Sequence, residues 1–183
     1  MKVVCFTFIL LILNNVSQIL SLEVGYPILR NYSPKEYKSN PQITCSVQDD
    51  RGVMCFGSDK LIEYDGVIWR DVYSDNFVRP YDFRKDRNGN IYASAVDEFG
   101  FLSLDKIGNT NYVNIKHLLP DSKIKLGILR SIAMTTSYFY FQSLEYTLQY
   151  SRTNEKIIAF PVENSETFNG CFEYKDICFV VSK

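Results

Sequence analysis

The sequence predicts an all-β fold made of repeated four-stranded units, and three observations predict it. The chain contains 13 Tyr and 13 Phe but one Trp among its 183 residues, and aromatic side chains favour the pleated, half-buried surface of a sheet. Its apolar stretches are short and are separated by polar turns about every 8–12 residues, which is typical of sandwiches, barrels and propellers. A pattern of strands and turns also recurs along the chain, and among these architectures the repeat favours the propeller.

The repeat is clearest in residues 46–65 and 83–105. Both segments read as a strand, a polar turn that ends in glycine, a short aromatic strand, a second turn, and a strand that ends in aspartate. The turn glycines, Gly52 and Gly89, are 37 residues apart. They supply the backbone freedom that a tight hairpin needs.

Two fainter copies begin near Arg130 and Asn169, and the second ends early. A period of about 40–50 residues with about four strands favours propeller blades. A plain β-sandwich is the alternative, but it does not require turns to recur at this period. We therefore predict a partial β-propeller of about three and a half four-stranded blades, forming an open arc. The predicted units are a signal peptide at 1–21, a leading segment at 22–40, and an incomplete propeller at 41–183, with blades at about 41–75, 76–116, 127–162 and, truncated, 168–183.

In the first blade, strands are expected near residues 42–48, 53–57, 61–64 and 67–72. Residues 115–128 are the one plausible helical departure from the β pattern. Pro120 and Gly127 would keep any helix there short, because both residues disfavour a helix interior.

The N-terminus reads as an export signal. Lys2 supplies a positive start, residues 3–13 form an uninterrupted apolar run of eleven residues, and Asn14 ends it. A membrane-spanning helix needs roughly 18–20 apolar residues, so this run predicts a signal peptide cleaved near Ser21. A buried N-terminal strand or helix is the alternative. Cleavage is expected to leave a periplasmic or secreted chain with no direct membrane span.

Four cysteines remain after such cleavage, two in each of two predicted hairpins: Cys45, Cys55, Cys171 and Cys178. Export permits disulfides, but directly opposed cysteines in adjacent strands fit disulfide geometry imperfectly. Small buried side chains are therefore favoured, and the redox state of the four stays open. A zinc site is disfavoured, because they do not form paired C-x-x-C ligands and the only histidine, His117, lies elsewhere. We expect no metal and no cofactor.

Ordered motifs in residues 40–72 sharpen the prediction. They are Asp49 or Asp50 with Gly52, Phe56-Gly57, Tyr64-Asp65-Gly66, and Trp69. This segment resembles a two-component-regulator propeller repeat, in which a D-x-x-G turn, an aromatic residue followed by glycine, and a Y-D-G turn before an aromatic residue occur in this order. Residues 90–105 continue the likeness, and the segment before residue 43 resembles that of exported sensors that often carry a triple-tyrosine domain after the propeller. Cys45, Cys55 and Lys60-Leu61 depart from the usual pattern.

The resemblance implies extracytoplasmic ligand sensing for a signal-transduction receptor, of which this chain is the N-terminal part. Relatives continue through further blades, a triple-tyrosine domain and a membrane helix to a kinase, cyclase or DNA-binding output. The implied partners are a small ligand, such as a carbohydrate, and the missing blades in a longer or separate chain. The ligand, the residues that bind it and the output domain are unknown. The alternatives are a propeller scaffold completed by another chain and an exported propeller enzyme that acts on carbohydrate.

No catalytic residue is predicted, and the chain is not expected to be an enzyme. His117 has no neighbouring motif to orient it, and Asp97-Glu98 reads as a pair of turn carboxylates rather than a glycosidase pair. Residues 86–90 superficially fit a calcium loop, but glycine is their fourth residue and not the sixth, so a hairpin turn is favoured. The turn at 49–52 is interpreted in the same way.

Charge and aromatic content bear on the possible partners. The net charge is -1, from 20 basic and 21 acidic residues that are interspersed, which predicts no nucleic-acid partner. Tyr64, Trp69, Phe99 and Phe101 could form a platform for a carbohydrate. Packing between blades is favoured for them, since strand aromatics usually fill the core.

An open arc predicts a marginally stable product with two uncovered blade faces. If each missing interface buries on the order of 500 Å² of apolar surface, each open face lacks roughly 12 kcal/mol of stabilisation. The net stability of a whole domain is only about 5–15 kcal/mol, and halving the estimate for a compact unfolded chain leaves the arc marginal. Unpaired strand edges also favour aggregation.

Overall fold

The structure is a computed structural model and describes residues 29–74, 79–162 and 167–182. The predicted signal peptide at 1–21 lies outside the described residues. Within them, all helix is confined to α2 (Pro34–Tyr37) and one turn of 3-10 helix, η1 (Lys116–Leu118). None of the helices in these ranges is long and apolar enough to cross a bilayer.

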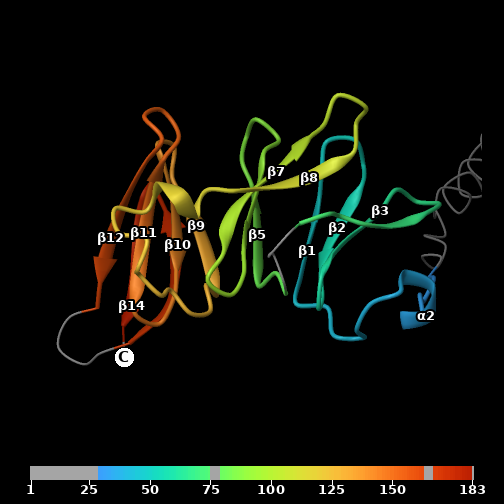
Figure 1. The fold of residues 1–183 in the computed structure, drawn as a ribbon, viewed down its shortest axis with the longest axis horizontal. Helices are drawn as coiled ribbons and strands as arrows, with labels where there is room; N and C mark the ends of the chain where they lie inside the picture. Colours follow the sequence, from blue (N-terminus) through green and yellow to red (C-terminus); the bar gives the residue numbers. More distant parts are fainter. Residues whose placement is uncertain (1–28, 75–78, 163–166, 183) are drawn as a thin grey trace, which may run out of the picture. The chain divides into compact units, whose positions relative to one another are not determined.

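The strands of the described ranges form three four-stranded antiparallel sheets and one two-stranded sheet, each with its strands in chain order (Figure 1). Sheet 1 contains β1 (Cys45–Gln48), β2 (Met54–Gly57), β3 (Leu61–Tyr64) and β4 (Trp69–Asp71). Sheet 2 contains β5 (Asp82–Lys85), β6 (Ile91–Ser94), β7 (Phe99–Leu104) and β8 (Thr110–Asn114). Sheet 3 contains β9 (Ser131–Met134), β10 (Tyr138–Gln142), β11 (Tyr146–Ser151) and β12 (Lys156–Pro161). Sheet 4 contains β13 (Phe168–Tyr174) and β14 (Ile177–Ser182).

Successive sheets meet through their first strands. Strand β1 contacts β5, β5 contacts β9, and β9 contacts β13. Repeated four-stranded meanders with their first strands side by side form a β-propeller. The array is open, so the predicted all-β, partial propeller is confirmed.

The predicted strands of the first blade overlap the four strands of sheet 1; β3 has the predicted bounds, and the other three strands are shorter than predicted. The expected helical departure at 115–128 is limited to the single turn η1. The sheets span 45–71, 82–114, 131–161 and 168–182. The blade boundaries drawn from the sequence stay predictions, because strands alone do not mark where one blade ends and the next begins.

The two outer faces of the array differ. On sheet 1, Trp69 lies 5.3 Å from Tyr32, 5.4 Å from Tyr37 and 4.6 Å from Tyr64 between ring centroids. We call these residues, together with Phe56, the cap cluster. Residues of the leading segment thus cover part of a face that the sequence predicted to be uncovered.

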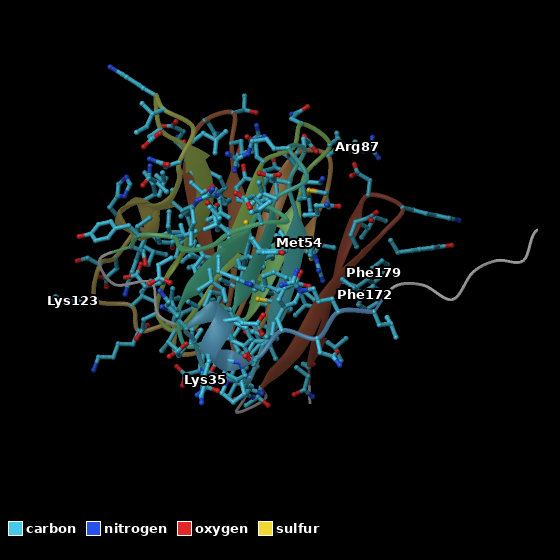
Figure 2. The ribbon with its side chains drawn as sticks, turned by 90° about the vertical axis from the view of Figure 1, so that its right-hand side faces the viewer. Lys35, Met54, Arg87, Lys123, Phe172 and Phe179 are labelled. Carbon is cyan, nitrogen blue, oxygen red and sulfur yellow. The ribbon has the colours of Figure 1, made fainter. Side chains whose placement is uncertain are left out.

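Sheet 4 has no such cover among the described residues. Five apolar side chains on one side of its hairpin are 42–58% exposed. We call them the open face: Phe172, Tyr174, Ile177, Phe179 and Val181. Figure 2 shows Phe172 and Phe179 on the outer side of this hairpin.

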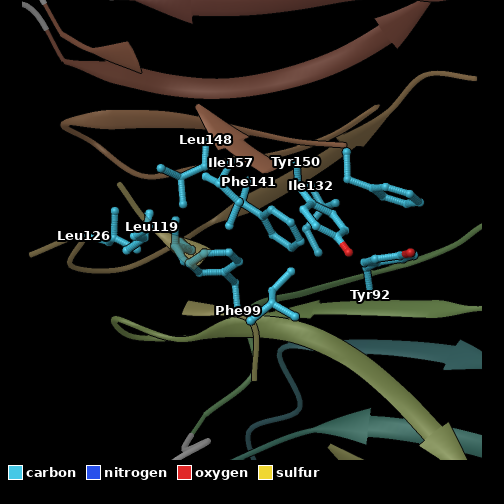
Figure 3. Close-up of a cluster of buried hydrophobic side chains, with 12 residues drawn as sticks. Tyr92, Phe99, Leu119, Leu126, Ile132, Phe141, Leu148, Tyr150 and Ile157 are labelled. Carbon is cyan, nitrogen blue, oxygen red and sulfur yellow. The ribbon is translucent and has the colours of Figure 1, made fainter. Parts of the chain in front are cut away.

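Two apolar clusters join the first three sheets. The smaller one lies between sheets 1 and 2 and includes Cys55, Leu61, Phe83 and Ile91. The larger one joins sheets 2 and 3 around Phe99 and Phe141, whose ring centroids lie 4.9 Å apart (Figure 3). Leu119, Leu126 and Leu129 from the connection between sheets 2 and 3 complete it. This segment therefore serves the core, although it is mostly irregular.

Gly100 shows how closely β7 and β8 approach each other. A Cβ atom at this position would lie 2.0 Å from the carbonyl oxygen of Val113 and 3.0 Å from the ring of Tyr112. Any larger residue would force the two strands apart, because backbone cannot yield as a flexible side chain does.

Candidate functional site

A cavity with a volume of about 890 Å³ lies at the turn ends of sheets 2, 3 and 4. The β5–β6, β9–β10, β11–β12 and β13–β14 turns line it. The lining residues are Asp86, Arg87, Asn88, Met134, Thr135, Thr136, Ser137, Phe139, Arg152, Thr153, Glu173, Lys175 and Asp176. A cavity of this size accommodates a small organic ligand.

The β5–β6 turn is organised by the carboxylate of Asp86. Its Oδ1 accepts hydrogen bonds from the backbone N–H of Asn88 at 2.9 Å and of Asn90 at 2.8 Å. Gly89 has a φ of +83°, which side chains on L-residues rarely allow. The carboxylate is therefore engaged by its own loop, and residues 86–90 form the predicted hairpin turn between β5 and β6.

Arg152 fixes one wall of the cavity from the β11–β12 turn. Its guanidinium forms an ion pair with Asp86, whose side chain is 7% exposed. The guanidinium carbon also lies 6.0 Å from the ring centroids of both Tyr92 and Phe139. This cation–π geometry holds the positive charge at the boundary between the apolar core and the cavity.

The β13–β14 turn closes the opposite wall. Asp176 accepts hydrogen bonds from the backbone N–H of Thr136 at 2.5 Å and from its hydroxyl at 2.8 Å. These bonds, with a weaker contribution from the positive charge of Arg87, hold the pKa of Asp176 below its usual range. The backbone N–H of Asp176 in turn donates to Glu173 at 2.6 Å. Sheets 3 and 4 are thus tied together at the rim of the cavity.

The cavity combines polar walls with an apolar base. Arg87 and Lys175 add two cationic donors, while Thr136 and Ser137 add hydroxyl groups. Phe139, which is 4% exposed, contributes its ring to the lining. Such a set of groups can orient a ligand that carries several hydroxyl or acidic oxygens. In the part of the chain that the structure describes, no group of three or more His, Cys, Asp or Glu side chains is placed to hold a metal ion.

A second, smaller cavity of about 190 Å³ lies at the same turn end between sheets 1 and 2. Here Arg51 donates to the carbonyl oxygen of Gly108 at 2.7 Å and to Thr110 Oγ1 at 3.0 Å. Lys85 also forms an ion pair with Asp50 at 2.9 Å across the two sheets. These cross-links narrow the space between the turns of sheets 1 and 2. The corresponding space between the turns of sheets 2, 3 and 4 stays open as the 890 Å³ cavity.

The polar residues considered as catalytic candidates in the sequence either bond to neighbouring segments or lie outside the cavity. Asp97 Oδ1 accepts hydrogen bonds from the backbone N–H of Leu126 at 2.6 Å and of Gly127 at 3.1 Å. Glu98 accepts a hydrogen bond from the side-chain amide of Asn114, and burial raises the pKa of Glu98. His117 is exposed in η1 and is not part of the cavity lining.

The four aromatic residues proposed as a platform or as core fall into two places. Phe99 is fully buried and Phe101 packs against the cluster between sheets 2 and 3. Tyr64 and Trp69 belong to the cap cluster and contact the leading segment rather than a second blade. None of the four lines the cavity.

All four cysteines after the predicted signal are free thiols. Cys45 is opposite Gly57, and Cys55 is opposite Val47, so the first pair is diagonal and not directly opposed. Burial raises the pKa of both thiols to about 12.

The second pair is diagonal too, since Cys171 is opposite Val180 and Cys178 is opposite Glu173. A hydrogen bond between the thiols lowers the pKa of Cys171 to about 7 and raises that of Cys178. The expected direct opposition of cysteines is therefore wrong in both hairpins, because each pair is offset by two residues.

The cavity itself was not predicted from the sequence. Its residues come from four turns that lie between positions 86 and 176. The signal that could have indicated it is the recurrence of the turns, because equivalent turns of successive blades lie at the same end of a propeller.

Comparisons with known proteins agree with the fold. No family model matches the chain, and no curated protein sequence matches it significantly. Among solved structures, a catalytically inactive virginiamycin B lyase from Staphylococcus aureus with quinupristin is 14% identical, with a TM-score of 0.61, over 87% of this chain and 54% of that one.

Two extracellular domains of hybrid two-component systems from B. thetaiotaomicron are also similar. The domain of BT4673 is 18% identical, with a TM-score of 0.55, over 75% of this chain and 18% of that one. The domain of BT3049 is 13% identical, with a TM-score of 0.55, over 72% of this chain and 20% of that one. The chain thus spans about a fifth of the length of these extracellular domains and about half of the lyase. At these identities the likeness concerns the fold.

Proposed function

We propose that this chain is the N-terminal part of an extracytoplasmic, ligand-sensing propeller of a signal-transduction receptor of the two-component or a related type. The observation that carries the proposal is the 890 Å³ cavity built from the turns of three successive sheets. The ligand is a small polar molecule, such as a carbohydrate. Export by the predicted signal peptide would deliver the domain to the periplasm or the exterior.

The chemistry of the cavity supports a sugar-like ligand. Sugars present many hydroxyl groups, which bind best to planar side chains with several donors or acceptors. Arg87, Asn88 and Glu173 are of this type, and Phe139 offers an apolar surface beside them. The extracellular domains of two-component systems that share this fold support a sensing role. The proposal includes an output domain elsewhere in the receptor.

An exported propeller enzyme is the second candidate, and the fold likeness to virginiamycin B lyase favours it. The described part of this chain places its one histidine, His117, outside the cavity lining. The carboxylates that line the cavity, and could act there as acid or base, are those of Asp86, Glu173 and Asp176. Two of these carboxylates accept hydrogen bonds from backbone N–H groups of the turns, and the third accepts one from Asp176. Binding without turnover is therefore favoured.

Isothermal titration of the chain with glucose, galactose, glucuronic acid and their disaccharides tests the proposal. We expect at least one sugar to bind, and Arg87→Ala to weaken that binding by roughly 10- to 150-fold, because it removes a charged hydrogen bond of about 1.5–3 kcal/mol. Arg130→Ala is the matched control, because Arg130 is exposed outside the cavity lining. Absence of binding by every sugar, or equal affinity in the Arg87→Ala and Arg130→Ala variants, would contradict the proposal.

A further inference from the structure

The open face of sheet 4 is one continuous apolar surface. Phe172 is opposite Phe179, and Tyr174 is opposite Ile177, so these four side chains project from the same side of the hairpin. The rings of Phe172 and Phe179 stack with their centroids 5.4 Å apart and 14° between their planes. Figure 2 shows both rings directed away from the other sheets. Contiguous exposed apolar patches of this kind mark interaction sites.

The other side of the same hairpin is already used. Cys171 is 8% exposed, and its backbone N–H donates to Ser131 Oγ at 3.2 Å. Its thiol lies 3.4 Å from the same hydroxyl. Sheet 4 is therefore docked on sheet 3 as sheet 3 is docked on sheet 2.

The open face corresponds to the covered faces of earlier sheets. Cys55, Tyr92 and Phe179 each lie in the second strand of their sheet, on the side toward the next position in the array. Cys55 is 1% exposed and packs against sheet 2, and Tyr92 is 3% exposed and stacks on Phe139 of sheet 3. Phe179 is 42% exposed. In sheets 1 and 2 this side of the second strand is covered by the next sheet. At Phe179 the equivalent position is exposed in the described part of the chain.

Strand β14 also has an edge that no strand of the described ranges pairs with. Strands β2, β6 and β10 pair with a strand on each side, whereas β14 pairs with β13. Its sequence, Ile177–Ser182, contains no charged residue and no proline. Natural edge strands usually carry such residues to block pairing. The amino-acid composition of β14 is therefore that of an internal strand.

We infer that the open face and the free edge of β14 are the docking surface for the continuation of the propeller. The occupant is a polypeptide that adds two antiparallel strands to β14, completing sheet 4, and then packs an apolar sheet over Phe172 and Phe179. Continuity with the three interfaces already formed specifies this occupant, and addition of a strand to an exposed edge is an established mode of recognition. The inference rests on the propeller fold and does not depend on the ligand.

The chain offers its own probe for this surface. Residues 145–162 contain β11 and β12, which are the third and fourth strands of sheet 3. A copy of these residues, appended after residue 183, should pair with β14 as the original pairs with β10. We expect hydrogen exchange to slow at least 100-fold at the amides of residues 177–182 that do not bond to β13, and the Tm to rise by about 5 °C.

The control is the same extension with Leu148→Pro and Tyr150→Pro in the appended copy, because proline cannot donate to the strand ladder. Equal protection of residues 177–182 by both extensions would overturn the inference. Protection, in the unextended chain, of the β14 amides that do not bond to β13 would overturn it as well. Sedimentation velocity would then show whether a second copy or the chain itself covers the edge. Sugar binding is measured separately, so failure of the sensing proposal leaves this test intact.

Discussion

The two ends of the propeller array differ in how far their outer apolar faces are covered. At sheet 1 the leading segment turns back through α2, where Ser33 and Glu36 form a capping box and Pro34 starts the helix. This turn brings Tyr37, which is 8% exposed, onto Trp69. At sheet 4 none of the residues that the structure describes covers the equivalent apolar surface. Among the described residues, the array thus has a covered end, which we call the finished end, and an exposed end, which we call the unfinished end.

The largest expected effect is at the finished end. The ring of Trp69 contacts each of the other four rings of the cap cluster. We therefore expect Trp69→Ala to lower the free energy of unfolding by about 2–3 kcal/mol. Urea denaturation followed by far-UV circular dichroism measures it. The control is Val67→Ala in the neighbouring turn, where the side chain is 82% exposed. A loss at Trp69 no larger than the loss at Val67 would mean that the cap does not stabilise sheet 1.

The unfinished end should tolerate substitution. Phe172→Ser combined with Phe179→Ser removes two exposed rings, and we expect the free energy of unfolding to change by less than about 1 kcal/mol. Fluorescence of 8-anilinonaphthalene-1-sulfonate should fall at least twofold, because the dye binds exposed apolar surface. A large loss of stability with unchanged dye fluorescence would show that the two rings are already buried.

A third prediction compares the reactivity of the thiols. Iodoacetamide should modify the Cys171–Cys178 pair several-fold faster than Cys45 or Cys55 at pH 8, because the thiolate is the nucleophile and the pKa of Cys171 is lowered to about 7. Cys45 and Cys55 have pKa values raised to about 12. Peptide mapping by mass spectrometry measures the rates. Uniform labelling of all four would contradict the assignment.

The smallest expected effect concerns acid. Asp65 accepts hydrogen bonds from the backbone N–H of Ile68 and Val67, and these bonds lower its pKa from 3.8 to about 2. A lowered pKa in the folded state adds stability above pH 4, and this stability is lost as the pH falls toward 2. Asp65→Asn should flatten that part of the pH dependence slightly, since the carboxylate is exposed. Urea midpoints between pH 5 and pH 2 test it, and an unchanged slope would argue against the turn bonds.

Local chemistry explains what could be predicted from the sequence. The turn at Asp86 follows from the D-x-x-G pattern, because an aspartate bonds its own backbone and glycine adopts a positive φ. The same geometry recurs at Asp105, which accepts from the backbone N–H of Ile107 and Asn109 at 2.9 Å each. The sequence interpretation treated Asp105 only as a strand end. Short-range periodicity was thus sufficient for the fold class and for most turns.

Long-range contacts explain what could not be predicted. The cavity depends on Thr136 meeting Asp176 and on Arg152 meeting Asp86, pairs that are 40 and 66 residues apart. The cap cluster likewise depends on Tyr32 reaching Trp69. No local pattern encodes such meetings, since they follow only from the stacking of complete sheets. The offset of the cysteines was missed because it depends on the register of each hairpin.

The turn between β13 and β14 has a consequence for the order in which the chain assembles. Lys175 and Asp176 both adopt positive φ values, 51° and 63°, although neither is glycine, and each such residue costs on the order of 1 kcal/mol. Thr136 offsets this cost by binding Asp176, so the hairpin gains its support only after sheet 3 exists. An isolated two-stranded hairpin is marginal in water. Sheet 3 should therefore form before sheet 4, in the direction in which the ribosome delivers the chain.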